Sequence, residues 1–222
     1  LTNKNLTLTN GASINADGVD CISATCQSGQ NFTIIADVIN LSGGSITSDG
    51  GAAITGTASH FSGDGGIINI NASRIYILSN SSAISASSDY IFGKSGINLD
   101  HAGGDGGTII INSTFINNTG KISAIGGSGG FACAGGVLQG QKGNGGLINI
   151  TSTEIHNTGF INVERGLYGA CDVTLRQSGR DGLIYINSTY SPCNNGTIFN
   201  WDTCKILSPI RVPNNFTLDL TG

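Results

Sequence analysis

The residues with the clearest chemical potential in this sequence are acidic, and they recur beside one repeated phrase. Asp64, Asp105 and Asp181 each stand one or two residues before a copy of the phrase, and Asn144 takes the equivalent place before another. Stacked carboxylates of this kind could bind Ca²⁺. One carboxylate per repeat supplies few oxygen ligands, and Asp-Gly is common turn chemistry. The sequence therefore predicts that these acidic residues have a structural role and that the protein binds no metal and no cofactor.

Histidines accompany two of these acids without forming a catalytic constellation. His60 and His101 each lie four residues before an Asp and could stack on each other. No Ser, Cys or carboxylate pattern completes a triad with them. A polysaccharide lyase or hydrolase would need gathered carboxylates, or a Ca²⁺ site beside a basic residue. The sequence therefore predicts a protein that is not an enzyme, and polysaccharide cleavage is the least favoured alternative.

The repeated phrase alternates apolar and mixed residues, which predicts a β-strand with one buried face. Its clearest copy is Gly107-Thr108-Ile109-Ile110-Ile111, and β-branched Ile suits a pleated surface. Further copies begin at Gly66, Gly146 and Gly182. Weaker copies are Asn5-Leu6-Thr7-Leu8, Asn31-Phe32-Thr33-Ile34 and Asn215-Phe216-Thr217-Leu218.

The spacing of the phrase predicts a solenoid. Successive copies are 26 to 41 residues apart, a period typical of solenoids, propellers or arrays. Two more isoleucine ladders follow the phrase, one through Ile39, Ile75, Ile116 and Ile155, the other through Ile14, Ile46, Ile84, Ile122, Ile161 and Ile198. Three short strands per repeat, with like residues stacked, predict an all-β, right-handed parallel β-helix. A propeller blade would have four strands, and a helical repeat would need a period of 3.6.

The repeat runs from end to end, which predicts a single β-solenoid domain over 1–222 with Gly-rich loops. Leu6 is expected opposite Phe32, and Phe32 opposite Ile68, in successive coils. The six to seven expected coils cover about 1–30, 31–65, 66–106, 107–145, 146–181 and 182–213, with a partial coil at 214–222.

The same register narrows the pairing of the six cysteines. Cys133 lies 11 residues after Ile122, and Cys171 lies 10 after Ile161, so these two should stack in adjacent loops. Six cysteines allow 15 pairings, and an even number suits disulfides in an extracellular protein. No CxxC pair or Cys/His cluster supports zinc. The predicted bridges are Cys21–Cys26, Cys133–Cys171 and Cys193–Cys204.

Asn-x-Ser/Thr sequons are dense, and strand alternation places the acceptors in the copies of the phrase on the solvent side. An acceptor must be exposed to carry a glycan. The pattern therefore predicts an N-glycosylated protein that is extracellular or on the cell surface. The sequons begin at Asn5, Asn31, Asn40, Asn71, Asn80, Asn112, Asn117, Asn149, Asn187, Asn195 and Asn215.

Composition excludes two classes of partner. Charged residues are 11% of the chain, the formal net charge is −4, and Lys and Arg do not cluster, so nucleic acid is not expected. No run of 18 apolar residues exists, so the sequence predicts no membrane span.

The pattern Gly-Gly-x-Ile-x-Ile, then Ile-x-x-x-Gly-x-Ile-x-Ala, then a Gly-rich loop, resembles the parallel β-helix repeats of large secreted adhesin and surface-fibre proteins. Gly106-Gly107-Thr108-Ile109-Ile110-Ile111 through Ile122-Ser123-Ala124-Ile125-Gly126-Gly127 carries the resemblance best. The resemblance implies surface display, adhesion or fibre building, and it carries over no catalytic residue.

Neither end of the sequence carries the amphipathic or polar cap that solenoids normally need. One reading is a domain cut from a longer array. The other is head-to-tail stacking with copies of itself, where a contact that does not close gives a filament. Filament assembly is the first functional hypothesis, and its expected contact residues are Leu6, Leu8, Phe216 and Leu218. An adhesin-type module that binds carbohydrate or cells through loops 87–104 and 126–145 is the alternative.

Overall fold

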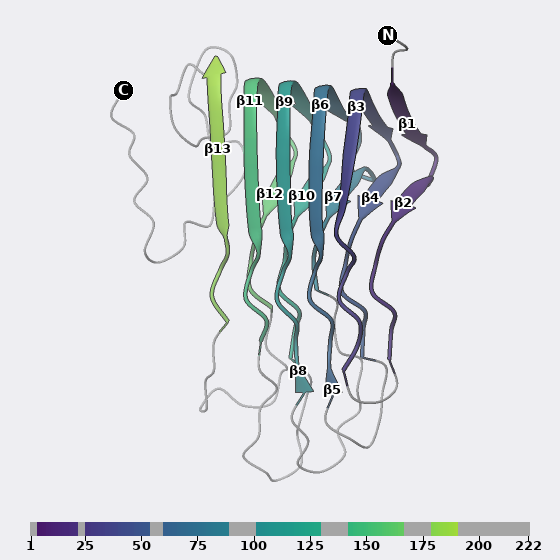
Figure 1. Cartoon of the computed structure of the whole chain (residues 1–222). Coiled ribbons are helices and arrows are strands. Elements are labelled where there is room, and N and C mark those ends of the chain that lie inside the picture. The colour runs from purple at the N-terminus through teal and green to yellow at the C-terminus, as the bar shows by residue number, and fades with distance from the viewer. Residues whose placement is uncertain are drawn as a thin grey trace, which may run out of the picture.

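The computed structural model describes residues 4–21, 25–53, 60–88, 101–129, 142–166 and 179–190, and their regular structure is entirely β (Figure 1). A large sheet has six strands, and a second sheet has five shorter ones. The large sheet contains β1 (Asn5–Thr9), β3 (Phe32–Ser42), β6 (Ile67–Ile77), β9 (Thr108–Asn118), β11 (Leu147–Asn157) and β13 (Leu183–Tyr190). The second contains β2 (Ser13–Asn15), β4 (Ser45–Thr47), β7 (Ala83–Ser85), β10 (Lys121–Ser123) and β12 (Phe160–Asn162).

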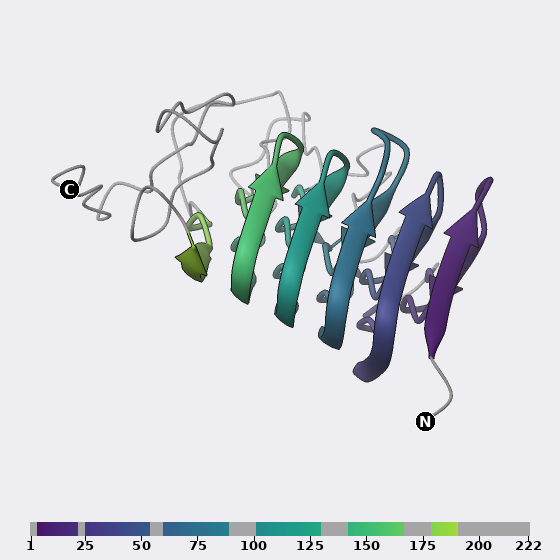
Figure 2. The same ribbon diagram turned by 90° about the horizontal axis from the view of Figure 1, so that it is seen from above.

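Every strand pair in the two sheets is parallel, and each sheet adds its strands in chain order. The chain passes from a long strand to a short strand and back again. Figure 2 shows the long strands as one row with the short strands behind it. A two-stranded sheet joins β5 (His60–Phe61) to β8 (His101–Ala102). The predicted all-β parallel architecture is confirmed, and no sheet closes on itself within the described residues.

The predicted ladders stack in register over most of the large sheet. Ile68 pairs with Ile109 and Ile109 with Ile148, and all three side chains are fully buried. The short strands supply the opposite wall of the core, where Ile84 pairs with Ile122. Each buried Ile contributes about 1.5–3 kcal/mol relative to an exposed one. These stacks are therefore the main source of stability in the described part of the chain.

The structure differs from the prediction in how the strands divide. The first two ladders were expected on separate short strands, yet β3, β6, β9 and β11 are single 11-residue strands. No Gly or Pro interrupts the sequence between Ile70 and Ile75, so the parallel pairing continues. The ladders are seven residues apart, an odd number, so the in–out alternation must shift once. It shifts at Ser73 and Arg74, which are both exposed.

The glycines before the strands allow the backbones of neighbouring strands to approach closely. A Cβ at Gly107 would overlap the carbonyl oxygen of Gly66, and a Cβ at Gly146 would overlap that of Gly107. At these places the N–H of Thr108 donates to Gly66 O at 2.9 Å, and that of Leu147 donates to Gly107 O at 2.9 Å. The Gly in the phrase therefore lets the ladder of hydrogen bonds begin.

The first strand does not lie where the repeat predicted. Leu6 pairs with Ile39, and Leu8 with Leu41, so the expected alignment of Leu6 with Phe32 is wrong. The reason is chain length. Ile14 pairs with Ile46, and the eight residues from Leu6 to Ile14 match the seven from Ile39 to Ile46. β1 therefore covers only the second half of β3.

Replacing Ile111 with Ala should destabilise the protein by about 2–5 kcal/mol, because it removes a fully buried side chain from a close-packed stack. Ile110 lies next to it on the same strand but is only half-buried, so Ile110→Ala should cost about 1 kcal/mol or less. Denaturant unfolding of both variants would measure the difference. Equal costs at the two positions would contradict the inward orientation of Ile111.

Candidate functional site

The outer edge of β1 forms one end of the large sheet. The carbonyl of Lys4 accepts the Asp37 N–H at 2.7 Å, and the Asn10 N–H donates to Ser42 O at 3.2 Å, so even-numbered residues face β3. Backbone polar groups alternate in direction along a strand. Asn5 and Thr7 therefore direct their N–H and C=O groups away from β3, where no described segment pairs with them. Such a row of unpaired groups is a template for another strand.

The core is also partly open at this end. Phe32 and Ile34 are only half-buried, whereas Ile68 and Ile70, their partners on the next strand, are 0% and 1% exposed. The predicted assembly residues Leu6 and Leu8 are half-buried and pack against the same core. Phe216 and Leu218, the other two predicted assembly residues, lie outside the described part of the chain.

The opposite end of the large sheet is formed by β13, which pairs only with β11 among the described residues. Ile184 and Ile186 on this strand are half-buried, although they are in register with the fully buried Ile148 and the nearly fully buried Ile150. Figures 1 and 2 place β13 and β1 at the two ends of one row of strands. Both ends of the described stack thus leave core residues incompletely covered.

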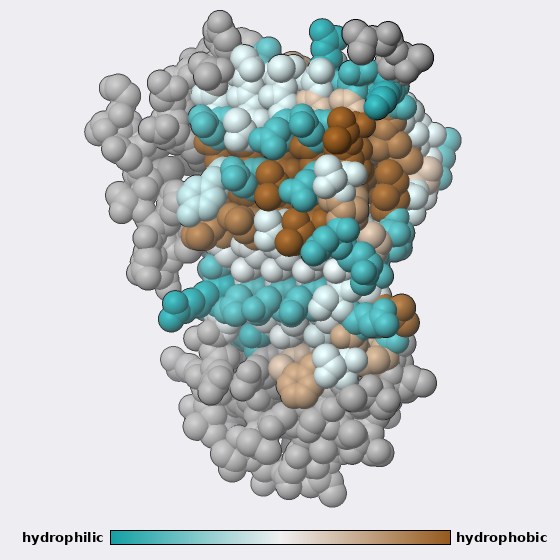
Figure 3. Space-filling view, viewed as in Figure 1, coloured by the Kyte–Doolittle hydropathy of each residue, from teal (hydrophilic) through white to brown (hydrophobic). Residues whose placement is uncertain are grey.

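The acidic residues singled out in the sequence form a ladder of backbone caps. The Asp64 carboxylate accepts the N–H of Asp105 at 2.7 Å, and the Asp105 carboxylate accepts the N–H of Asn144 at 2.7 Å. The Asn144 side chain in turn accepts the N–H of Arg180 at 2.8 Å. Figure 3 shows a hydrophilic band across this face, below the more hydrophobic region over the long strands. Each side chain therefore satisfies a backbone donor of the following repeat.

Asp181 does not belong to this ladder, contrary to the sequence interpretation. Arg180 takes the equivalent place, and the Asp181 carboxylate instead accepts the backbone N–H of Arg165 at 3.2 Å. The Arg165 Nε lies 3.7 Å from the same carboxylate oxygen. Among the described residues, no three His, Cys, Asp or Glu side chains converge on a point where a metal ion could bind.

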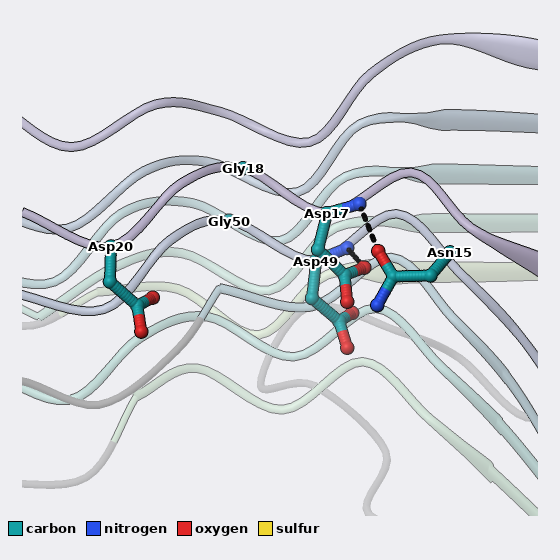
Figure 4. A pocket seen from close by; sticks show the side chains of 6 residues that line it. All are labelled: Asn15, Asp17, Gly18, Asp20, Asp49 and Gly50. Atoms are coloured by element: carbon teal, nitrogen blue, oxygen red, sulfur yellow. Dashed lines mark hydrogen bonds between the residues drawn. The ribbon is translucent and has the colours of Figure 1, made fainter.

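A second acidic ladder, which sequence reasoning missed, lines a polar hollow of about 410 Å³ (Figure 4). Asp17 accepts the N–H of Asp49 at 2.7 Å, and Asp49 accepts the N–H of Ser87 at 2.6 Å. Asp20 likewise accepts the N–H of Ala52 at 2.7 Å. These carboxylates are backbone caps like those of the first ladder. Asp-Gly recurring after 32 residues, at Asp17 and Asp49, was the signal that could have found them.

The predicted Cys21–Cys26 disulfide is present, with the two Cα atoms 5.0 Å apart. Cys133, Cys171, Cys193 and Cys204 lie outside the described residues. His60 and His101 pair in register on β5 and β8, so their backbones stack as expected. The central parts of the two loops expected to carry adhesin contacts, 89–100 and 130–141, also lie outside the described residues.

The described sequon acceptors differ in their exposure to solvent. Asn71 and Asn112 are exposed and in register on neighbouring strands, and Asn187 is exposed on β13. Exposed as well are Asn5, Asn31 and Asn80, whereas Asn40, Asn117 and Asn149 are half-buried. Asn195 and Asn215 lie outside the described residues. Six of the nine described acceptors are thus exposed, and glycosylation itself stays a prediction.

Comparison of the chain with protein-family models, with curated proteins and with solved structures finds no match in any of the three. Within the described residues, no helix exists that is long and apolar enough to cross a lipid bilayer.

Replacing Asp105 with Ala should destabilise the protein by about 1 kcal/mol, because the Asn144 N–H loses its acceptor. Asp105→Asn keeps an oxygen at the same place and should recover most of the loss. Thermal unfolding of both variants, with and without Ca²⁺, would test the cap. A Ca²⁺-dependent gain in stability that only the parent chain shows would indicate a metal site instead.

Proposed function

We propose that the chain is an extracellular structural glycoprotein whose copies stack end to end into a filament. The observation that carries the proposal is that the first rung of the large sheet is incomplete, where a rung is the stretch of chain that covers one long strand. β1 covers only the second half of β3, its outer edge is unpaired among the described residues, and the core residues Phe32 and Ile34 are only half-buried. If the far end of another copy stacked here, it would pair with the strand edge and cover the two core residues. Because the contact is heterologous and does not close, it continues indefinitely.

The proposal includes the finer architecture expected from the sequence, a right-handed parallel β-helix. Its support is the regular course of the chain, which adds one long and one short strand in each complete repeat. Isoleucines from both sheets meet in one core cluster, as in a coil wound around a continuous interior. Stacked coils of this kind rise about 4.8 Å each, so a subunit of six to seven coils would add roughly 30 Å to the filament.

The sequons support an extracellular setting for this assembly. Their exposed members on the long strands point to the side of the sheet, so glycans there would coat a filament without blocking its ends. Asn112 and Asn187 illustrate this placement. The Cys21–Cys26 bridge agrees with an oxidising compartment.

Replacing Thr7 with Pro should abolish end-to-end assembly while the chain stays folded. Proline removes an N–H that faces away from β3, so no hydrogen bond to a described residue is lost. Thr7→Val is the matched control, because it also removes the sequon at Asn5 but keeps the N–H. Electron microscopy and sedimentation velocity at equal concentrations would compare the two.

The valine variant should form filaments like the parent chain, and the proline variant should sediment as a monomer. Unchanged filaments from the proline variant would contradict pairing through the edge of β1. A parent chain that is monodisperse at every concentration would contradict filament assembly and favour the adhesin-type binding module.

Replacing Asn112 with Gln should reduce the mass of the secreted protein by one glycan, because Asn112 is an exposed sequon acceptor. Asn69→Gln is the control, since Asn69 lies on the same face of the sheet but begins no sequon. Mass spectrometry of the protein purified from its source, before and after enzymatic release of N-glycans, gives the readout. An unmodified Asn112 in that protein would contradict a glycan-coated side.

A further inference from the structure

The first half of β3 is an open slot in the large sheet. β1 pairs only with residues 38–42, so Phe32, Thr33, Ile34, Ile35 and Ala36 have no strand partner on that side among the described residues. On the other side, all five pair with β6. The slot is therefore an open stretch of the β3 edge that lies in line with β1.

Backbone polar groups aim into this slot. On the later strands the N–H groups of Thr108 and Leu147 donate to the preceding strand. Alternate residues of a strand direct their polar groups the same way. By the same register, Thr33 and Ile35 direct N–H and C=O groups toward the slot, and no described residue meets them.

The side chains around the slot specify the strand that would fit it. Phe32 and Ile34 face the core and are only half-buried, and Ile35 on the outer face is 68% exposed. At the inward-facing positions of neighbouring long strands, each apolar residue stacks on another apolar residue, as Ile68 does on Ile109. The slot thus fits a parallel strand with apolar residues at alternate positions.

We propose that Asn215–Leu218 of a second copy fills the slot, with Phe216 on Phe32 and Leu218 on Ile34. The segment reads Asn-Phe-Thr-Leu, and the first residues of the slot region read Asn-Phe-Thr-Ile. This C-terminal segment, called the tail below, would supply the first half of a rung, and β1 would supply the second half. One complete rung would then be shared by two copies. This inference rests on the proposed function, because it names the contact that joins the copies.

Two sources could supply the segment, the far end of a second copy and the tail of the same chain. β13 is separated from β3 by three intervening strands, and it stands at the far end of the row (Figure 2). The four strand spacings amount to about 19 Å, a distance that the 24 residues between Tyr190 and Asn215 are long enough to span. The cross-linking test below therefore separates the two sources. The proposal takes the second copy as the source, because a copy stacked end to end on β1 would bring its own β13 end to the slot.

A pair of cysteines at Thr33 and Thr217 tests the register. Both positions would lie on the outer face of neighbouring parallel strands, where Cα atoms about 4.8 Å apart are within the range that a disulfide spans. The full-length double variant should give covalent dimers and longer species on a non-reducing gel. These species should disappear with reductant and be absent from both single variants.

The control is the pair Thr7→Cys with Thr217→Cys, which places one cysteine on β1 instead of in the slot. Filaments that cross-link through Thr7 and not through Thr33 would overturn the inference and leave stacking intact. A cross-linked product that runs as a monomer would show that the chain fills its own slot, which also overturns it. A parent chain that never assembles would remove the proposed function itself.

A synthetic peptide of residues 213–222 gives a second measurement that needs no variant. Added in excess to the full-length chain, it should occupy the slot and cause loss of filaments, whereas a scrambled peptide should not. Filaments that resist the peptide at saturating concentration, in a chain that fails to cross-link at Thr33, would contradict the inference.

Discussion

The structure depends on one constraint, the in-register parallel stacking of each repeat on the one before it. Once backbones lie about 4.8 Å apart, every position must accept nearly the same side chain in successive repeats. Ile suits the inward positions because its branched side chain packs against a copy of itself, as Ile109 does on Ile148. Gly suits places such as Gly107, where a Cβ would overlap the preceding carbonyl. The low charge and high glycine content of the chain follow from the same constraint.

The polar ladders satisfy backbone N–H groups that lie outside the strands. Where the chain approaches or leaves a strand, its N–H groups still need acceptors, and a short side chain of the preceding repeat supplies them. Asp64 and Asp17 each accept a backbone N–H of the following repeat in this way. A carboxylate committed to a backbone donor is held in one orientation and has fewer free lone pairs for a metal or a substrate. The acidic residues that first suggested chemistry are therefore part of the scaffold.

The sequence predicted the parts of the fold in which one alignment is clearly best. The isoleucine ladders through Ile68, Ile84 and Ile116 were found because their spacing repeats with the same residue type. Leu6 was misplaced because a Leu-x-Leu pair fits either half of β3, and the deciding distance to Ile14 was not weighed. The continuous 11-residue strands were not predicted, because the spacing of apolar residues marks the buried positions but does not show that strand pairing continues between them. Caps such as Asp49 were missed because the Asp-Gly pairs at Asp17 and Asp49 stand after the short strands, and only those before the long strands were compared.

Stacking also sets how strong an end contact can be. Phe32 and Ile34 are already half-buried, so covering both gains about 1.5–3 kcal/mol, roughly half the value for full burial, while association costs about 4–15 kcal/mol. A four-residue tail in the slot of β3 would therefore hold two copies only weakly. A complete rung adds the unpaired edge of β1, with the half-buried Leu6 and Leu8 behind it. Because both halves of the rung must pair together, assembly would be cooperative, and it would respond sharply to the loss of either half.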